Sequence, residues 1–276
     1  MGGMPKPSPE VRKKRWRRRG IVYGSLVVAL ASFWWWTPWE FDFIPRTLPN
    51  PHPAVDPDRD RLFRKGTRVL LVTAHPDDSE FYIGGFLTQL GKSAEIHQIL
   101  CTDGDKTYYG PFTNASENRR VRQQEARAAA KAWNGRAVSF LGHPDGRLAY
   151  SEEAVNRVVE EIRRFRPEYV LAFDGQFPPR MSHQDHRRAG DIALEAARRS
   201  GVPRWALLFS TIAPNFVIDI TDDWDRKKEL LQIHASQFNG ERLSRVTNMV
   251  AGMAESDGER IGVGLGEGFR CVRLNP

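Results

Sequence analysis

Residues 69–100 read VLLVTAHPDDSEFYIGGFLTQLGKSAEIHQIL, a β-type run at 69–73, a helix-type run at 84–90 and a second β-type run at 96–100. Apolar strands that alternate with helices are typical of βαβ units, in which helices cover both faces of a parallel sheet. This segment therefore predicts strands at the centre of an α/β fold, with a helix layer on each side.

The same alternation continues along the chain. Further helix-type runs lie at 117–133, 152–165 and 186–199, and further β-type runs lie at 138–141, 169–173 and 205–209. Ser151 is a plausible N-cap for the second of these helices, which carries two glutamates in its first turn. The pattern predicts a Rossmann-like three-layer fold with a mainly parallel sheet, and mixed or antiparallel additions after Ile212.

Composition favours one folded domain and argues against a nucleic-acid partner. The chain has 276 residues, of which 40% are hydrophobic, and a formal net charge of +7. Residues 1–19 hold eight basic residues against one acidic residue, a net of +7, so the charges of the remaining chain cancel. No basic face with interleaved aromatic residues is evident on the predicted domain. Cys101 and Cys271 match no metal or redox spacing; they could form one disulfide, but their apolar settings favour buried free thiols.

The first 66 residues predict a membrane anchor and a spacer. Residues 20–39 carry no charge and are about as long as the ~20 residues that cross a hydrocarbon core as a helix. Basic residues precede this segment and tryptophans close it, which predicts a cytoplasmic amino terminus and an external domain. We expect a basic cytoplasmic arm at 1–19, a transmembrane anchor at 20–39, a proline-rich spacer at 40–66 and a folded domain at 67–276.

Other functions of the apolar segment stay open. Residues 29–31, Ala-Leu-Ala, could be a signal-peptidase site, and residues 18–22 faintly resemble a twin-arginine export signal. A helix that lies on a surface or in the core is a third alternative.

Two clusters of histidine and aspartate carry the chemistry. Thr73 to Glu80 directly follows the first strand, and Ser182 to His186 follows the strand at 169–173 by a loop. Because ligands collect at the carboxyl ends of parallel strands, the two clusters can converge on one point. A lone His-Pro-Asp turn is more often a simple loop. Two such clusters favour a site for a divalent metal such as zinc or iron(II).

The spacing suggests which residues of the two clusters bind the metal and which one acts as the base. His75 and Asp78 can reach one metal from a tight turn, and His186 can complete a set of three ligands with an open position for water. A metal lowers the pKa of such a water toward ~7. Asp77 is then left over as the base that takes its proton.

The pair of motifs His75-Pro76-Asp77-Asp78 and His183-x-Asp185-His186 resembles the signature of the PIG-L (LmbE-like) family of zinc-dependent deacetylases. The resemblance extends from about Arg68 to Arg273. It implies that His75, Asp78 and His186 bind Zn²⁺, with Fe²⁺ as the alternative, and that Asp77 is the general base.

The same resemblance implies roles around the metal. His183 would stabilise the oxyanion or protonate the leaving amine, and Asp185 would orient His183 or support a metal ligand without binding the ion itself. Arg122 and Asp145 would contact the sugar, although a helix-surface arginine and a turn aspartate are the plain alternatives. Ser79 stands where many relatives have glutamate, so no role follows for Glu80.

The resemblance implies hydrolysis of the acetyl group of an N-acetylglucosamine-type sugar, polysaccharide or glycolipid by a zinc-bound hydroxide. The alternatives are a metallohydrolase of another amide or ester, and a non-catalytic sugar-binding relative. With the predicted anchor, we expect a single-pass protein of the bacterial cytoplasmic (inner) membrane, with the catalytic domain outside or periplasmic.

Overall fold

A seven-stranded sheet forms the centre of the fold. The computed structural model describes residues 53–106, 114–177 and 182–275. The strands are β1 (Arg68–Thr73), β2 (Glu95–Thr102), β3 (Ala137–His143), β4 (Tyr169–Phe173), β5 (Trp205–Phe209), β6 (Phe216–Asp219) and β7 (Gly266–Arg273). Their order is β3-β2-β1-β4-β5-β7-β6.

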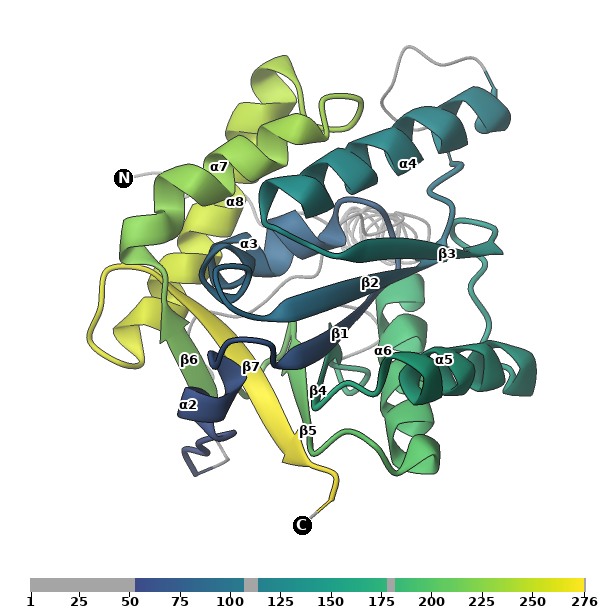
Figure 1. Ribbon diagram of the computed structural model, residues 1–276. Coiled ribbons are helices and arrows are strands. Elements are labelled where there is room, and N and C mark those ends of the chain that lie inside the picture. Colours follow the sequence, from purple (N-terminus) through teal and green to yellow (C-terminus); the bar gives the residue numbers. More distant parts are fainter. Residues whose placement is uncertain (1–52, 107–113, 178–181, 276) are drawn as a thin grey trace, which may run out of the picture. The chain divides into compact units, whose positions relative to one another are not determined.

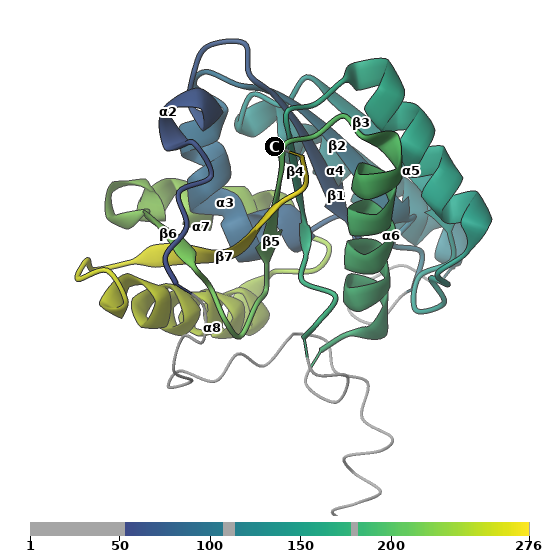
Figure 2. The ribbon, with the colours of Figure 1, turned by 90° about the horizontal axis from the view of Figure 1, so that it is seen from below.

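The predicted parallel sheet with antiparallel additions is confirmed. β1 pairs in parallel with β2 and β4, β2 with β3, and β4 with β5. β7 is antiparallel to both β5 and β6. β7 and β6 lie at one end of the sheet, with β6 as the edge strand (Figure 2). Each residue of β4 is buried, as expected of a strand covered on both faces.

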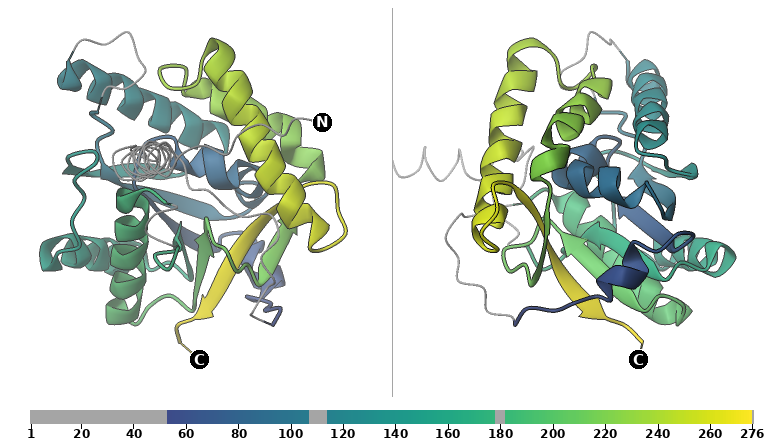
Figure 3. Two further views of the ribbon diagram at one scale, coloured as in Figure 1. Left: turned by 180° about the vertical axis from the view of Figure 1, so that it is seen from behind. Right: turned by 60° about the vertical axis from the view of Figure 1, so that its left-hand side comes forward.

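Helices cover the sheet in two layers (Figure 1). One layer holds α3 (Asp78–Leu90), α4 (Ala115–Ala132) and α7 (Trp224–Ile233), and the other holds α5 (Glu152–Phe165) and α6 (Gln184–Ser200). α8 (Gly240–Glu259) packs against α7, β6 and β7 (Figure 3). The short helix α2 (Arg59–Leu62) precedes β1 and places Leu62 in the core, and a 3₁₀ turn (Thr221–Asp223) precedes α7.

Local sequence explains where α5 begins. Ser151 accepts a hydrogen bond from the Ala154 amide at 3.2 Å, so it is the N-cap that the sequence predicts for α5. α6 lies very close to β4, because a Cβ atom on Gly190 would stand 2.3 Å from the carbonyl oxygen of Phe173. Only glycine fits this approach.

Both cysteines, Cys101 and Cys271, are buried as free thiols, as the sequence predicts.

The predicted membrane localisation needs correction. Crossing a bilayer takes about 20 predominantly apolar residues in one helix. Within residues 53–106, 114–177 and 182–275, none of the helices combines that length with enough apolar character. The longest of them, α8, carries charged residues along its length. We therefore withdraw the assignment to a membrane with an external domain. The predicted arm, the span at 20–39 and most of the spacer lie outside the described residues.

Candidate metal centre

The two predicted clusters meet where the strand order reverses. The chain runs outward from β1 through β2 to β3 and then returns to β4 on the other side of β1. As a result α3 leaves β1 toward one face of the sheet and α6 follows β4 on the opposite face (Figure 1). Loops that part in this way open a crevice at the carboxyl ends of the strands, which is the usual ligand site of such sheets.

His75, Asp78 and His186 bring three ligand atoms together in this crevice. His75 Nδ1 lies 3.2 Å from His186 Nε2 and 3.5 Å from Asp78 Oδ1, and the last two atoms are 3.1 Å apart. Tetrahedral ligands with bonds of about 2.0–2.1 Å stand about 3.3–3.4 Å from one another. The three side chains are buried, and their donor set and spacing fit a divalent metal ion.

Neighbouring groups hold two of these ligands in place. Asp78 Oδ2 accepts hydrogen bonds from the Ala74 and His75 amides at 3.0 and 2.6 Å, which leaves Oδ1 to face the two histidines. The ring of Phe173 stacks on His186 with 4.1 Å between centroids and 6° between planes. Asp78 and His186 are therefore oriented by contacts that do not depend on a metal.

Charge in the cluster favours a cation. Burial opposes the ionisation of Asp78, but the two imidazoles outweigh burial and hold the pKa of this carboxyl well below its usual range. Burial likewise opposes the protonation of His75, yet Asp145 and Asp78 raise its pKa well above the ordinary value. Three carboxylates surround this one imidazole, so positive charge is stabilised here.

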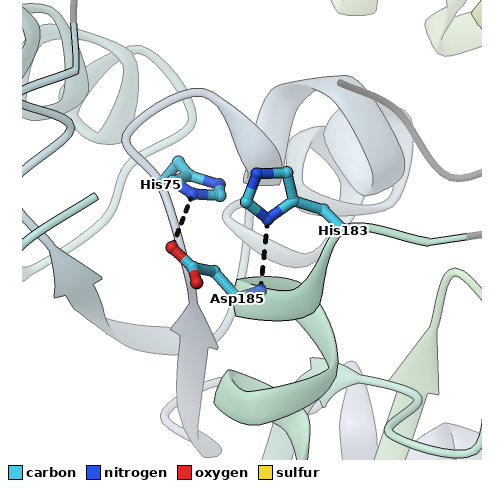
Figure 4. A group of neighbouring side chains, drawn as sticks. All are labelled: His75, His183 and Asp185. Carbon is cyan, nitrogen blue, oxygen red and sulfur yellow. Dashed lines mark hydrogen bonds and ion pairs between the residues drawn. The ribbon is translucent and has the colours of Figure 1, made fainter. Parts of the chain in front are cut away.

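The other nitrogen of His75 faces two carboxylates. His75 Nε2 lies 3.2 Å from Asp145 Oδ1 and 3.4 Å from Asp185 Oδ2 (Figure 4), but among the described residues it makes no well-aligned hydrogen bond. Histidines that bind a metal through one nitrogen commonly present the other to a carboxylate. Asp145 and Asp185 are placed to serve His75 in this way.

A second set of potential ligands shares His75 with the first and adds His183 and Asp185 (Figure 4). In this set His183 Nδ1 and both Asp185 oxygens already accept hydrogen bonds. His183 Nδ1 accepts the Asp185 amide hydrogen at 3.1 Å, and the two Asp185 oxygens accept the amides of Gly146 and Leu148 at 2.6 and 3.1 Å. The set of His75, Asp78 and His186 is therefore the better candidate.

Residues 70–197 match the PIG-L family, described as GlcNAc-PI de-N-acetylase. This part of the chain belongs to the PIG-L family. Diacetylchitobiose deacetylase from Thermococcus kodakarensis is 28% identical to the chain over 193 residues, which cover 64% of the chain and 72% of that enzyme.

One solved structure shows the same relationship, and a second shows the same fold. The N,N'-diacetylchitobiose deacetylase of Pyrococcus horikoshii, in complex with its inhibitor MPG, gives a TM-score of 0.72 at 28% identity and covers 78% of this chain and 87% of that one. GalB, the 4-carboxy-2-hydroxymuconate hydratase of Pseudomonas putida, gives a TM-score of 0.62 at 24% identity over 75% of this chain and 96% of that one. This second likeness shows the fold alone, so the chemistry has to be argued from the site.

Arg122 and Asp145 lie inside the site of the PIG-L domain. Arg122 is 5% exposed, and it donates from Nη2 to Asp77 Oδ1 at 3.1 Å and from Nη1 to Asp145 Oδ2 at 3.3 Å. The alternative of a helix-surface arginine is therefore wrong. Through these bonds Arg122 connects Asp77 with Asp145, whose other oxygen faces His75.

All eight predicted site residues of the PIG-L domain come together, but with contacts that the sequence did not indicate. The backbone amide of Asp185, not its carboxylate, donates a hydrogen bond to His183, while the carboxylate accepts amide hydrogens from the loop after β3. Glu80 is buried away from solvent, where it accepts the Trp133 indole hydrogen at 2.7 Å and lies 2.9 Å from His234 Nε2. These contacts join α3, α4 and the end of α7.

Sequence reasoning missed one carboxylate, Asp105. It lies three residues beyond β2, and its Oδ1 accepts the amide hydrogen of Asp145 at 2.9 Å. A signal was present, because a polar run also follows β2 at the same edge of the sheet as the two histidine clusters.

Proposed function

We propose that this chain is a metal-dependent deacetylase that hydrolyses the acetamide of an N-acetylglucosamine-type sugar, with zinc as the metal. The supporting observation is the mutual spacing of 3.1–3.5 Å among the atoms of His75, Asp78 and His186, beside an aspartate and a histidine outside this set. The named relatives that share 28% identity are deacetylases of diacetylchitobiose.

His75, Asp78 and His186 would hold the metal. When bound, such an ion acts as a Lewis acid toward the carbonyl and lowers the pKa of a coordinated water. The remaining steps rest on the chain's own residues. Hydrolysis adds water to the acetyl carbonyl, breaks the C–N bond and gives acetate and the sugar amine.

Asp77 is the proposed base that takes the proton from the attacking water. It is the N-cap residue of α3, next to the ligand Asp78, and its carboxylate is 15% exposed. The bond from Arg122 to Oδ1 fixes the carboxylate while it leaves Oδ2 available for a proton. A base held in this way typically contributes 10²–10⁴ in rate.

His183 is the proposed donor to the oxyanion. Burial, together with the neighbouring His75 and His186, lowers the pKa of His183 to about 3, so the ring is neutral at pH 7. Since Nδ1 accepts the Asp185 amide hydrogen, the ring proton of the neutral form resides on Nε2. An N–H directed at the developing charge stabilises the transition state more than the ground state.

The test combines metal content with product release. The purified full chain, stripped with a chelator and reloaded with Zn²⁺ or Fe²⁺, should release acetate from N-acetylglucosamine or N,N'-diacetylchitobiose. Replacing any one of His75, Asp78 and His186 by alanine should lower bound metal and abolish turnover. His97→Gln is the matched control, because this histidine bonds Ser139 on the neighbouring strand.

Three results would count against the proposal. Full metal occupancy in all three alanine variants would show that other residues bind the ion. Efficient cleavage of another amide or an ester, with no acetate from any N-acetyl sugar, would leave only a metallohydrolase. Metal binding without hydrolysis of any acyl compound would instead favour a non-catalytic sugar-binding protein.

A further inference from the structure

Two carboxylates from different elements hold the loop after β3. Asp185, at the start of α6, accepts the Gly146 and Leu148 amides, and Asp105, beyond β2, accepts the Asp145 amide at 2.9 Å. Three backbone N–H groups within four residues are thus bonded to side-chain carboxylates. Charge-assisted bonds of this kind are shorter and stronger than bonds between neutral groups.

The loops after β2 and β3 lie against each other at this point. Gly146 has a φ of +77°, and a Cβ atom on it would stand 2.7 Å from Lys106 Nζ. The second oxygen of Asp105 lies 3.4 Å from Arg119 Nη2, and the Asp105 side chain is 19% exposed. One side of Asp105 therefore faces an ion pair near the surface, and the other side faces the backbone of the site.

The bond from Asp105 determines where Asp145 stands. The Asp145 side chain is 8% exposed and divides its oxygens between His75 Nε2 at 3.2 Å and Arg122 Nη1 at 3.3 Å. A carboxylate has only two rotatable bonds beyond the backbone, so a fixed amide fixes the region that its oxygens can reach. Among the described residues, Asp105 makes no hydrogen bond or ion pair with the proposed ligands or with Asp77.

We propose that Asp105 is a positioning residue, which holds the Asp145 backbone so that the Asp145 carboxylate can support the metal ligand His75 and the arginine that orients Asp77. The part of this proposal that concerns Arg122 and the base Asp77 rests on the proposed function. The part that concerns His75 does not, because it can be measured by metal binding alone.

The first test is a double-mutant cycle on zinc affinity, measured by chelator competition on the full chain. Loss of a carboxylate beside a ligating histidine typically weakens metal binding by roughly 10–100-fold. We expect Asp145→Ala to show such a loss and Asp105→Ala a smaller loss in the same direction. If Asp105 acts through Asp145, the double variant should match Asp145→Ala within about twofold. Zinc affinity unchanged in Asp105→Ala, or losses that multiply in the double variant, would overturn the proposal.

Two further variants separate the backbone bond from charge. Asp105→Asn keeps an oxygen that can accept the Asp145 amide hydrogen, so it should recover most of the zinc affinity. Arg119→Gln removes the ion pair on the other oxygen and should bind zinc like the wild type. If Asp105→Asn bound zinc as weakly as Asp105→Ala, or if Arg119→Gln did so, the charge of Asp105 and not its bond to the Asp145 amide would be what matters.

Activity at saturating zinc provides the second readout. Asp105→Ala should lower kcat/KM for N,N'-diacetylchitobiose, and Asp105→Asn should restore most of it. If the wild type released no acetate from any N-acetyl sugar, the proposed function would fail. The double-mutant cycle on zinc affinity would still decide the role of Asp105.

Discussion

A buried ion pair bonds the backbone next to a break in α3, the helix that begins at the proposed metal ligand Asp78. Ile83 has non-helical angles, φ −133° and ψ 27°, which interrupt α3 five residues after Asp78. Beyond the break, the Gly85 and Phe86 amides donate to Glu267 at 3.0 and 2.7 Å. Lys227 donates to Glu267 at 2.6 Å and to the Tyr82 carbonyl at 3.3 Å. We expect Lys227→Met to destabilise the fold strongly.

The structure gives the size of this effect. Lys227 and Glu267 are 2% and 3% exposed, so removal of the lysine leaves a carboxylate in the interior with only two backbone donors. Breaking a buried pair from one side costs about 3–5 kcal/mol. Against a typical total of 5–15 kcal/mol, this is a large share of the stability. For a domain of this size it corresponds to a Tm lower by roughly 6–20 °C.

Urea unfolding of the full chain measures the loss, and the adjacent lysine provides a control. Lys228 pairs with Asp225 at 2.6 Å on the surface, where Asp225 is 89% exposed. Exposed pairs contribute about 0–1 kcal/mol, so Lys228→Met should change the free energy of unfolding little. The double variant Lys227→Met/Glu267→Gln should be more stable than Lys227→Met alone, because the uncompensated charge is gone. A loss below about 1 kcal/mol in Lys227→Met would refute this reasoning.

Three further predictions concern the base, its arginine and a buried acid. Asp77→Asn should keep the metal but lose roughly 10²–10⁴ in kcat, and wild-type turnover would remove Asp77 from the mechanism. Arg122→Ala should lower kcat as well as kcat/KM for N-acetyl sugars, because Arg122 bonds both Asp77 and Asp145; an effect on KM alone would contradict a role at the base. Burial raises the pKa of Asp257 to about 6, so the folded chain holds this proton more tightly and stability falls as pH rises from about 4 to about 6. Asp257→Asn should flatten that slope in urea titrations and gain at most about 3 kcal/mol at pH 7, whereas an unchanged slope would assign it to other groups.

The centre of the fold could be predicted from sequence because its elements are strongly patterned. The predicted strands at 169–173 and 205–209 and the helix at 152–165 have the bounds that the structure shows. α3 was harder, since it begins at Asp78 and not at residue 84. Its first turn is polar because Asp78 faces the candidate site and Glu80 bonds Trp133 in the interior, and polar residues there resemble a loop. The strand order depends on packing between distant segments, which periodicity does not contain.

The site shows a similar division. Residue types and their place after strands were enough to indicate which side chains gather. Their contacts were not accessible in this way, because a side chain such as that of Arg122 can point outward or inward from the same helix. Its burial follows from the strand order and from the loop at Gly104, whose carbonyl it also bonds at 3.1 Å. The polar run after β2 marks the place of Asp105, but its partner is a backbone amide, so the sequence does not show which residue it bonds.

The close approach at Gly190 links the geometry of the proposed metal site to the distance between α6 and the sheet. His186 lies one turn before Gly190 on α6, whereas His75 and Asp78 follow β1 on the other side of the crevice. The ligand set is therefore split between two bodies whose separation is set by glycine against the Phe173 carbonyl. A methyl group at residue 190 would push α6 outward, and metal–ligand distances tolerate only about ±0.2 Å. If these three side chains hold an ion as proposed, the distances among them depend on a glycine outside the ligand set, and a wider gap would suit ions that form longer bonds.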